Sequence, residues 1–233
     1  MAEETPLSIR HPDGPVAGGV VVVQEVFGVT PHIEDVCQRL ADVGWLAVAP
    51  HLYHRTGDPV VPHDQIAEGR RHAGQLTAEG ILADVDAALR YVEGAGFPRD
   101  TTGIVGFCMG GTIAMVVAAA RQVGAAVTFY GSGIANGRFG FPPLLEVAPK
   151  LRAPWLGLYG DLDAAIPVDE VEQLAGAAAG SDVHTEVVRY PDAGHGFNRD
   201  GSSAYHEPSA RDAWMRMLDW FADNLTTGAT ETG

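Results

Sequence analysis

The sequence contains few cysteines and no long hydrophobic segment. Only two cysteines occur among its 233 residues, Cys37 and Cys108, which is too few for a disulfide framework. No run reaches the roughly 18 consecutive apolar residues that a membrane-spanning helix needs. The first eight residues, MAEETPLS, lack the apolar core of a signal peptide. We therefore expect a cytoplasmic protein with reduced thiols and no membrane partner.

Positive charge is also scarce, because 15 Lys and Arg residues face 30 Asp and Glu residues and give a formal net charge of −15. Such a field repels phosphates, so we expect no nucleic-acid partner. The sequence has no H-E-x-x-H or C-x-x-C motif, no G-x-G-x-x-G motif and no phosphate-binding P-loop. We expect neither a metal nor another cofactor, and an anionic substrate would need a local cation.

Short apolar runs, typical of strands buried on both faces, alternate with segments of helical period. We expect strands at Val20–Val23, Trp45–Ala49, Gly103–Val105, Ala125–Tyr130, Trp155–Tyr159 and Thr185–Tyr190. We expect helices at 31–43, 64–94 with breaks at Gly74 and Gly80, 109–121, 168–179 and 204–225. This alternation predicts an α/β fold with a mostly parallel sheet flanked by helices on both faces.

The chain shows no internal repeat and no domain linker, so we expect a single domain over residues 1–225 that acts as a monomer. Gly131–Pro149 is rich in glycine and proline and should be irregular. The last helix should present an inner apolar stripe of Trp214, Met217, Leu218, Phe221 and Leu225. The tail, residues 226–233, is predicted to be disordered.

The segment Gly106–Gly110 (GFCMG) has the pattern of a nucleophile between two glycines, directly after a strand and before a helix. Glycines are needed there because a nucleophile on such a sharp turn brings neighbouring backbones into contact. A thiol at the start of a helix also benefits from the helix dipole, which stabilises a thiolate. The alternative is that Cys108 is an inert packing residue. That role is the one we expect for Cys37, which lies on the apolar stripe of its helix.

Candidate partners for the thiol follow two later strands. The loop after Tyr159 carries Asp161 and Asp163, and spacing does not decide between them. The loop after Tyr190 carries His195 between two glycines. The order nucleophile, acid, histidine is that of α/β-hydrolases. The other histidines are expected to be surface or capping residues: His11, His32, His51, His54, His63, His72, His184 and His206.

With these residues the sequence resembles the dienelactone hydrolase family of α/β-hydrolases. The resemblance runs in family order from about residue 20 to residue 225 and so covers nearly the whole chain. The matching segments are 24–29 (QEVFGV), 50–53 (PHLY), 106–111 (GFCMGG), 130–131 (YG), 160–167 (GDLDAAIP) and 193–197 (AGHGF).

The resemblance implies a role for each matching residue. Cys108 would be the nucleophile, His195 the base and Asp163 the acid, which lies four residues before Pro167. Glu25 matches a buried glutamate that helps to generate the thiolate when substrate arrives.

The backbone N–H groups of Met109 and Val26 would form the oxyanion hole. Arg199 would hold a carboxylate of the substrate. A second arginine of this kind is expected upstream, with Arg70 as the candidate and Arg71 as the fallback.

We therefore expect hydrolysis of a lactone or enol ester by a Cys-His-Asp triad through a thioester acyl-enzyme. A general esterase or thioesterase with no requirement for a substrate carboxylate is the alternative within this class. A non-catalytic redox or ligand-binding protein of the same fold is the alternative outside it.

Overall fold

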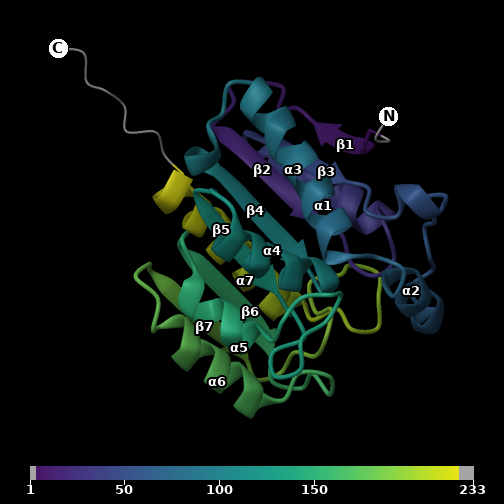
Figure 1. The fold of residues 1–233 in the computed structure, drawn as a ribbon, viewed down its shortest axis with the longest axis vertical. Helices are drawn as coiled ribbons and strands as arrows, with labels where there is room; N and C mark the ends of the chain where they lie inside the picture. Colours follow the sequence, from purple (N-terminus) through teal and green to yellow (C-terminus); the bar gives the residue numbers. More distant parts are fainter. Residues whose placement is uncertain (1–3, 226–233) are drawn as a thin grey trace.

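The computed structural model describes residues 4–225, so the predicted disordered tail, 226–233, lies outside the described residues. At its centre is a seven-stranded sheet in the order β1-β3-β2-β4-β5-β6-β7 (Figure 1). The strands are β1 (Leu7–Arg10), β2 (Gly18–Val23), β3 (Trp45–Pro50), β4 (Thr102–Phe107), β5 (Ala125–Phe129), β6 (Trp155–Gly160) and β7 (Thr185–Tyr190). Neighbouring strands pair in parallel, except that β1 is antiparallel to β3.

Helices cover both faces of this sheet, with α4 in front and α7 behind in Figure 1. The helices are α1 (Pro31–Asp42), α2 (Ile66–Ala73), α3 (Ala78–Gly94), α4 (Met109–Ala120), α5 (Leu144–Val147), α6 (Val168–Ala178) and α7 (Glu207–Leu225), with short 3₁₀ turns η1 (His54–Thr56), η2 (Arg99–Thr101) and η3 (Ala148–Lys150). On one face, Arg39 of α1 lies 3.7 Å above the ring of Trp214 in α7. On the other, Arg121 after α4 pairs with Asp86 of α3. The predicted α/β architecture is confirmed.

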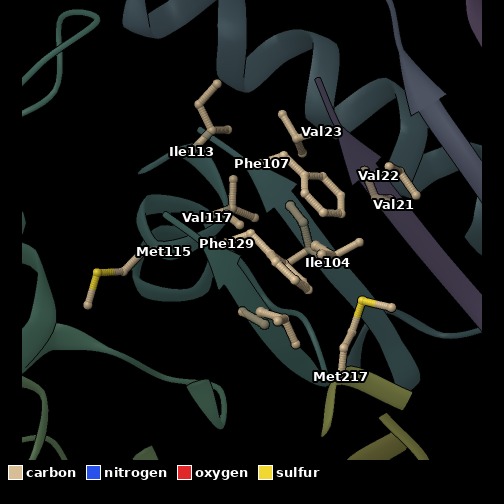
Figure 2. Packing of buried hydrophobic residues seen from close by; sticks show 14 of the residues in the cluster. Val21, Val22, Val23, Ile104, Phe107, Ile113, Met115, Val117, Phe129 and Met217 are labelled. Carbon is tan, nitrogen blue, oxygen red and sulfur yellow. The ribbon is translucent and has the colours of Figure 1, made fainter. Parts of the chain in front are cut away.

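The centre of the core lies between β4, β5 and the helices that pack on them. Phe107 and Phe129, which end these two strands, stack with ring centroids 4.7 Å apart. Figure 2 shows both rings together with Ile104, Val23 and Met217. All five side chains are fully buried or nearly so. Burying such side chains is worth about 1.5–3 kcal/mol each, which anchors the ends of β4 and β5, where the following loops begin.

The structure departs from the expected elements in a few places. Strand β1 was not expected, because its four residues are only partly buried and carry too short a pattern to detect. The expected helix over 64–94 is two helices, which separate near Gly74 but continue through Gly80. In α7 the buried stripe includes Trp220, while Leu218 is only partly buried. The irregular segment 131–149 contains the short helix α5.

Two histidines that were expected at the surface or as caps, His32 and His72, are buried instead, and the side chain of a third, His54, is nearly inaccessible. His32 packs edge-on against Phe107, and His72 lies beside the ring of Tyr53. The ring of His54 is 3 % exposed because its Nε2 contacts the fully buried carboxylate of Asp84 at 3.1 Å. Each ring meets a partner from a distant element, which local sequence does not reveal.

No helix within residues 4–225 is both long and apolar enough to cross a membrane.

Candidate active site

The turn from β4 into α4 holds Cys108 in an unusual conformation. Its φ is 53° and its ψ is −112°, and a positive φ is uncommon outside glycine. The Cys108 N–H donates to the carbonyl oxygen of Phe129 at 3.0 Å, and its own carbonyl accepts from the N–H of Gly111 at 3.0 Å. Backbone bonds to β5 and α4 thus hold the strained turn, as in a nucleophile elbow.

Two glycines make this turn possible by allowing backbones to touch. A Cβ on Gly106 would lie 1.9 Å from the carbonyl oxygen of Gly110. A Cβ on Gly110 would lie 2.1 Å from the carbonyl oxygen of Val23, at the end of β2. Both distances are far inside van der Waals contact, so no side chain fits at either position. The sequence pattern of the elbow therefore reflects direct packing of α4 against β2 and β4.

His195 and Asp163 lie side by side on the loops after β7 and β6. His195 Nδ1 is 2.6 Å from Asp163 Oδ2, and the carboxylate is almost fully buried. The other oxygen, Oδ1, accepts the Ala165 N–H at 2.8 Å, which fixes the carboxylate. Asp161 instead pairs with Arg189 at 2.8 Å near the surface. Of the two aspartates that spacing left open, Asp163 is the one beside the histidine.

The environment of His195 favours a charged ring. Burial alone lowers the pKa of His195, but the side chains of Cys108 and Asp163 raise it, and the net pKa is about 10. Among the effects that raise this pKa, the charge of Cys108 is the largest. Because imidazolium is the favoured form, the ring is suited to stabilise a thiolate and to donate a proton to a leaving group.

Glu25 follows β2 and is fully buried. Arg199 Nη1 lies 3.2 Å from its Oε1 and 3.4 Å from its Oε2, and His63 Nε2 lies 3.8 Å from Oε2. Burial raises the pKa of Glu25, and Arg199 opposes this effect without cancelling it. Glu25 is therefore a buried carboxyl with an increased affinity for protons, and its proton affinity depends on how closely Arg199 is held.

Arg199 is the cation of this buried pair. Its side chain is only 11 % exposed, and its guanidinium lies 5.4 Å from the centre of the Phe27 ring. It does not belong to the lining of the cavity described below. The expected role of Arg199 in holding a substrate carboxylate stays a prediction, since it requires the guanidinium to exchange Glu25 for the substrate.

The two backbone N–H groups expected in the oxyanion hole border the thiol. Met109 is the first residue of α4, so its N–H is one of the helix amides that have no partner within the helix. Val26 lines the same cavity as Cys108. Its carbonyl oxygen accepts the Tyr53 hydroxyl at 2.9 Å, which fixes the backbone there. An oxygen bound to the carbonyl carbon under attack could receive both donors.

A cavity of about 580 Å³ opens above Cys108 at the carboxyl edge of the sheet, where ligands bind in folds of this kind. His195 and Asp163 also line it. Its outer walls come from α2, which contributes Ile66 and Arg70, and from the loop after β5. A volume of this size suits a small organic substrate.

Two arginines on the cavity wall have no acidic partner among residues 4–225. Arg70 has no ion pair, whereas Arg71 pairs with Glu68 and does not line the cavity. Arg138, on the loop after β5, donates to the Ser132 hydroxyl at 3.3 Å. Of the 15 Lys and Arg residues, nine pair with a carboxylate in this part of the chain, so two of the remaining six meet at one cavity.

Sequence reasoning did not single out Arg138, Ser132 or Phe139 as site residues, although all three line the cavity. They belong to the segment expected to be irregular. A usable signal was present, since a loop that follows a parallel strand at its carboxyl end belongs to the ligand-binding edge. An arginine in such a loop of a strongly acidic chain is a candidate for binding an anion.

Comparison with known proteins shows the family to which this chain is similar. The sequence profile of the dienelactone hydrolase family matches residues 8–225. A Salmonella typhimurium protein named "Putative carboxymethylenebutenolidase" is 42 % identical over 205 residues, which are 87 % of this chain and 76 % of that protein. The "Carboxymethylenebutenolidase" of Pseudomonas putida is 32 % identical over 207 residues, which are 87 % of this chain and 84 % of that protein.

A solved structure shares the fold over nearly its full length. The crystal structure named "Putative Dienelactone Hydrolase" from Klebsiella pneumoniae superposes with a TM-score of 0.85 at 41 % identity. The match covers 94 % of this chain and 93 % of that one.

The coupling between Cys108 and His195 predicts the titration of the histidine. Replacing Cys108 by Ala removes an interaction that raises the pKa of His195, so that pKa should fall below its wild-type value of about 10. The ring proton resonances of His195, followed by NMR as a function of pH, measure the change. Cys37→Ala, which alters a cysteine buried in the core, is the matched control and should leave the titration unchanged. An unaltered His195 titration in Cys108→Ala would show that the thiol and the ring are not coupled.

Proposed function

The chain belongs to the dienelactone hydrolase family and is a hydrolase of lactone or ester bonds, and we propose that it acts through Cys108, His195 and Asp163. The observation that carries this proposal is that all three line one cavity, with His195 Nδ1 2.6 Å from Asp163 Oδ2 and Cys108 on a strained elbow. The substrate is a lactone or an enol ester, as the resemblance to the family implies.

The first half of the reaction forms a thioester. The Cys108 thiolate attacks the carbonyl carbon, and the N–H groups of Met109 and Val26 hold the negative oxygen that develops. Collapse of the tetrahedral intermediate breaks the bond to the leaving oxygen, which takes a proton from protonated His195. In an enol lactone the leaving oxygen becomes an enol that stays attached to the acyl group, so the ring opens.

The second half regenerates the thiol. Neutral His195 takes a proton from water, which attacks the thioester and releases the carboxylic acid, with Cys108 leaving as thiolate. Glu25 then returns its proton to the sulfur. Asp163 Oδ2 accepts from the Nδ1 side of His195, which leaves Nε2 free to face Cys108 and the substrate. Because the carboxylate is buried and fixed by the Ala165 N–H, the ring keeps this orientation through both halves.

Glu25 supplies the base for the thiol proton in this proposal. Burial raises the pKa of Glu25 overall, and the positive charge of Arg199 limits this increase. A substrate carboxylate that binds Arg199 removes part of the positive charge from Glu25, so Glu25 becomes a stronger base when substrate is present. The resemblance implies the same order, in which the thiolate forms only when substrate arrives.

The alternative within the same class is a hydrolase of neutral esters or thioesters. The observation that favours it is that Arg199 is committed to Glu25 and does not line the cavity. The observation that favours an anionic substrate is that two arginines on the cavity wall, Arg70 and Arg138, have no acidic partner within residues 4–225. In a chain of net charge −15, these cations would be the local groups that draw an anion into the cavity.

Replacing Cys108 by Ala should abolish hydrolysis of activated esters, since the variant loses the nucleophile. The fold should stay intact, because only one partly buried sulfur is removed. Steady-state kinetics with 4-acetoxybenzoate measures the loss, and circular dichroism checks the fold. Cys37→Ala is the matched control and should keep its activity. Retained turnover in Cys108→Ala would refute the role of the thiol.

Replacing Arg70 or Arg138 by Met should lower selectivity for anionic substrates. We expect the ratio of kcat/KM for 4-acetoxybenzoate to kcat/KM for its neutral methyl ester to fall about tenfold, as expected for losing one charged hydrogen bond. Arg152→Met removes an exposed arginine away from the cavity and controls for the change in net charge. Equal effects on both esters, or the same fall in Arg152→Met, would argue against a carboxylate site on this wall.

A further inference from the structure

Tyr130, the residue directly after β5, carries a hydroxyl with no partner. The side chain is fully buried, and its oxygen has no hydrogen-bond partner among residues 4–225. By contrast, the buried hydroxyl of Tyr53 donates to Val26, and that of Tyr190 donates to Asp212. A buried hydroxyl without a partner costs free energy, so the Tyr130 hydroxyl is free to donate to an acceptor that comes within reach.

The backbone of Tyr130 is strained as well. Its φ is 40°, one of few positive values outside glycine in the described chain, and Cys108 on the neighbouring strand has another. The two strained residues are linked, because the Cys108 N–H donates to Phe129, the residue before Tyr130. Strain of this kind persists where the surrounding structure enforces it and gathers at functional sites.

The ring of Tyr130 lies inside the catalytic region without reaching the substrate cavity. Its centroid is 5.0 Å from that of His195 and 5.4 Å from that of Phe197. Tyr130 is fully buried and does not line the cavity, so it cannot touch a bound substrate directly. Any effect of its hydroxyl on the reaction must pass through another residue, which makes Tyr130 a positioning residue.

The acceptor for this hydroxyl can be identified by elimination. Burial, and then the charge of Glu25, hold the pKa of Tyr130 well above its usual range, and the smaller effects of Cys108 and Asp163 act in the same direction. Both oxygens of Asp163 already have partners, His195 and Ala165. Glu25 is held by Arg199 at 3.2 and 3.4 Å, which is long for a charge-assisted hydrogen bond, and its other basic neighbour, His63 Nε2, lies 3.8 Å away.

We propose that the Tyr130 hydroxyl donates a hydrogen bond to the Glu25 carboxylate once Arg199 no longer contacts that carboxylate. This inference rests on the proposed function, in which a substrate carboxylate draws Arg199 away. Tyr130 keeps its proton throughout. Glu25 takes the proton of the Cys108 thiol, so that the S–H bond breaks, an O–H bond forms on Glu25, and the electron pair stays on sulfur. The hydroxyl fixes Glu25 where that transfer is possible.

Tyr130→Phe tests the proposal because it keeps the ring and removes only the hydroxyl. We expect kcat/KM for 4-acetoxybenzoate to fall about tenfold, the size typical of a hydrogen bond to a charged group. The melting temperature should stay the same or rise, because the variant removes a buried hydroxyl that lacks a partner. In a Glu25→Gln background the same substitution should have little further effect, since the two residues act together.

Tyr159→Phe is the matched control. Its hydroxyl is also buried without a partner among residues 4–225, but it belongs to β6, and Asp163 is the one charge of the site that acts on it, whereas Glu25 and Cys108 do not. The Tyr159→Phe variant should be at least as stable as the wild type, like Tyr130→Phe, and should keep its hydrolytic activity. Wild-type kcat/KM in Tyr130→Phe would overturn the proposal. An undiminished tenfold fall in the Glu25→Gln background would also overturn it, because the hydroxyl would then act on another group.

Alkylation of Cys108 by iodoacetate gives a readout that does not need ester hydrolysis. Its carboxylate offers Arg199 an anion, and its rate reports formation of the thiolate. The rate at Cys108, measured by peptide mass spectrometry, should fall in Tyr130→Phe and not in Tyr159→Phe. If Cys108 is alkylated more slowly in Tyr130→Phe than in the wild type, but the wild type hydrolyses no ester, the proposed function fails while the role of Tyr130 stands. Equal alkylation rates in all three proteins would refute that role.

Discussion

Direct backbone contact between β2, β4 and α4 is the constraint on which the site depends. With Gly106 and Gly110 in place, α4 approaches β2 so closely that no side chain fits between them. The approach forces Cys108 into a positive φ and places it at the start of α4. The parallel sheet then brings the loops after β6 and β7 to the same edge, where Asp163 and His195 meet.

Beside the elbow, the buried negative charge of Glu25 is offset by the positive charge of Arg199. Glu25 has one strong cation, Arg199, and burial keeps its pKa raised even so. A buried carboxyl in this condition changes its proton affinity when its cation moves. Within the described part of the chain, the Tyr130 hydroxyl has no hydrogen-bond partner and two arginines of the cavity wall have no acidic partner, so these are the groups that can respond. In this account, substrate binding and thiol ionisation are linked through one ion pair.

The sequence predicts much of the fold, because short apolar runs such as Val20–Val23 are typical of strands that are buried on both faces. It misses β1, whose four residues at the sheet edge are only half buried. Cys108 and His195 could be found from the glycines around them. The choice of Asp163 needed either the resemblance or the structure. Arg138 could not be found, because its role depends on a cavity formed by distant elements.

The central claim is that Cys108 forms a covalent thioester. Rapid-quench mass spectrometry of the peptide that contains Cys108, taken during turnover of an activated ester, tests it most directly. His195→Ala should be measured beside the wild type, because loss of the general base slows release of the acyl group. We predict a transient mass increase equal to the acyl group on Cys108, removable by hydroxylamine. Ester hydrolysis with no acyl group on that peptide in either protein would contradict the account.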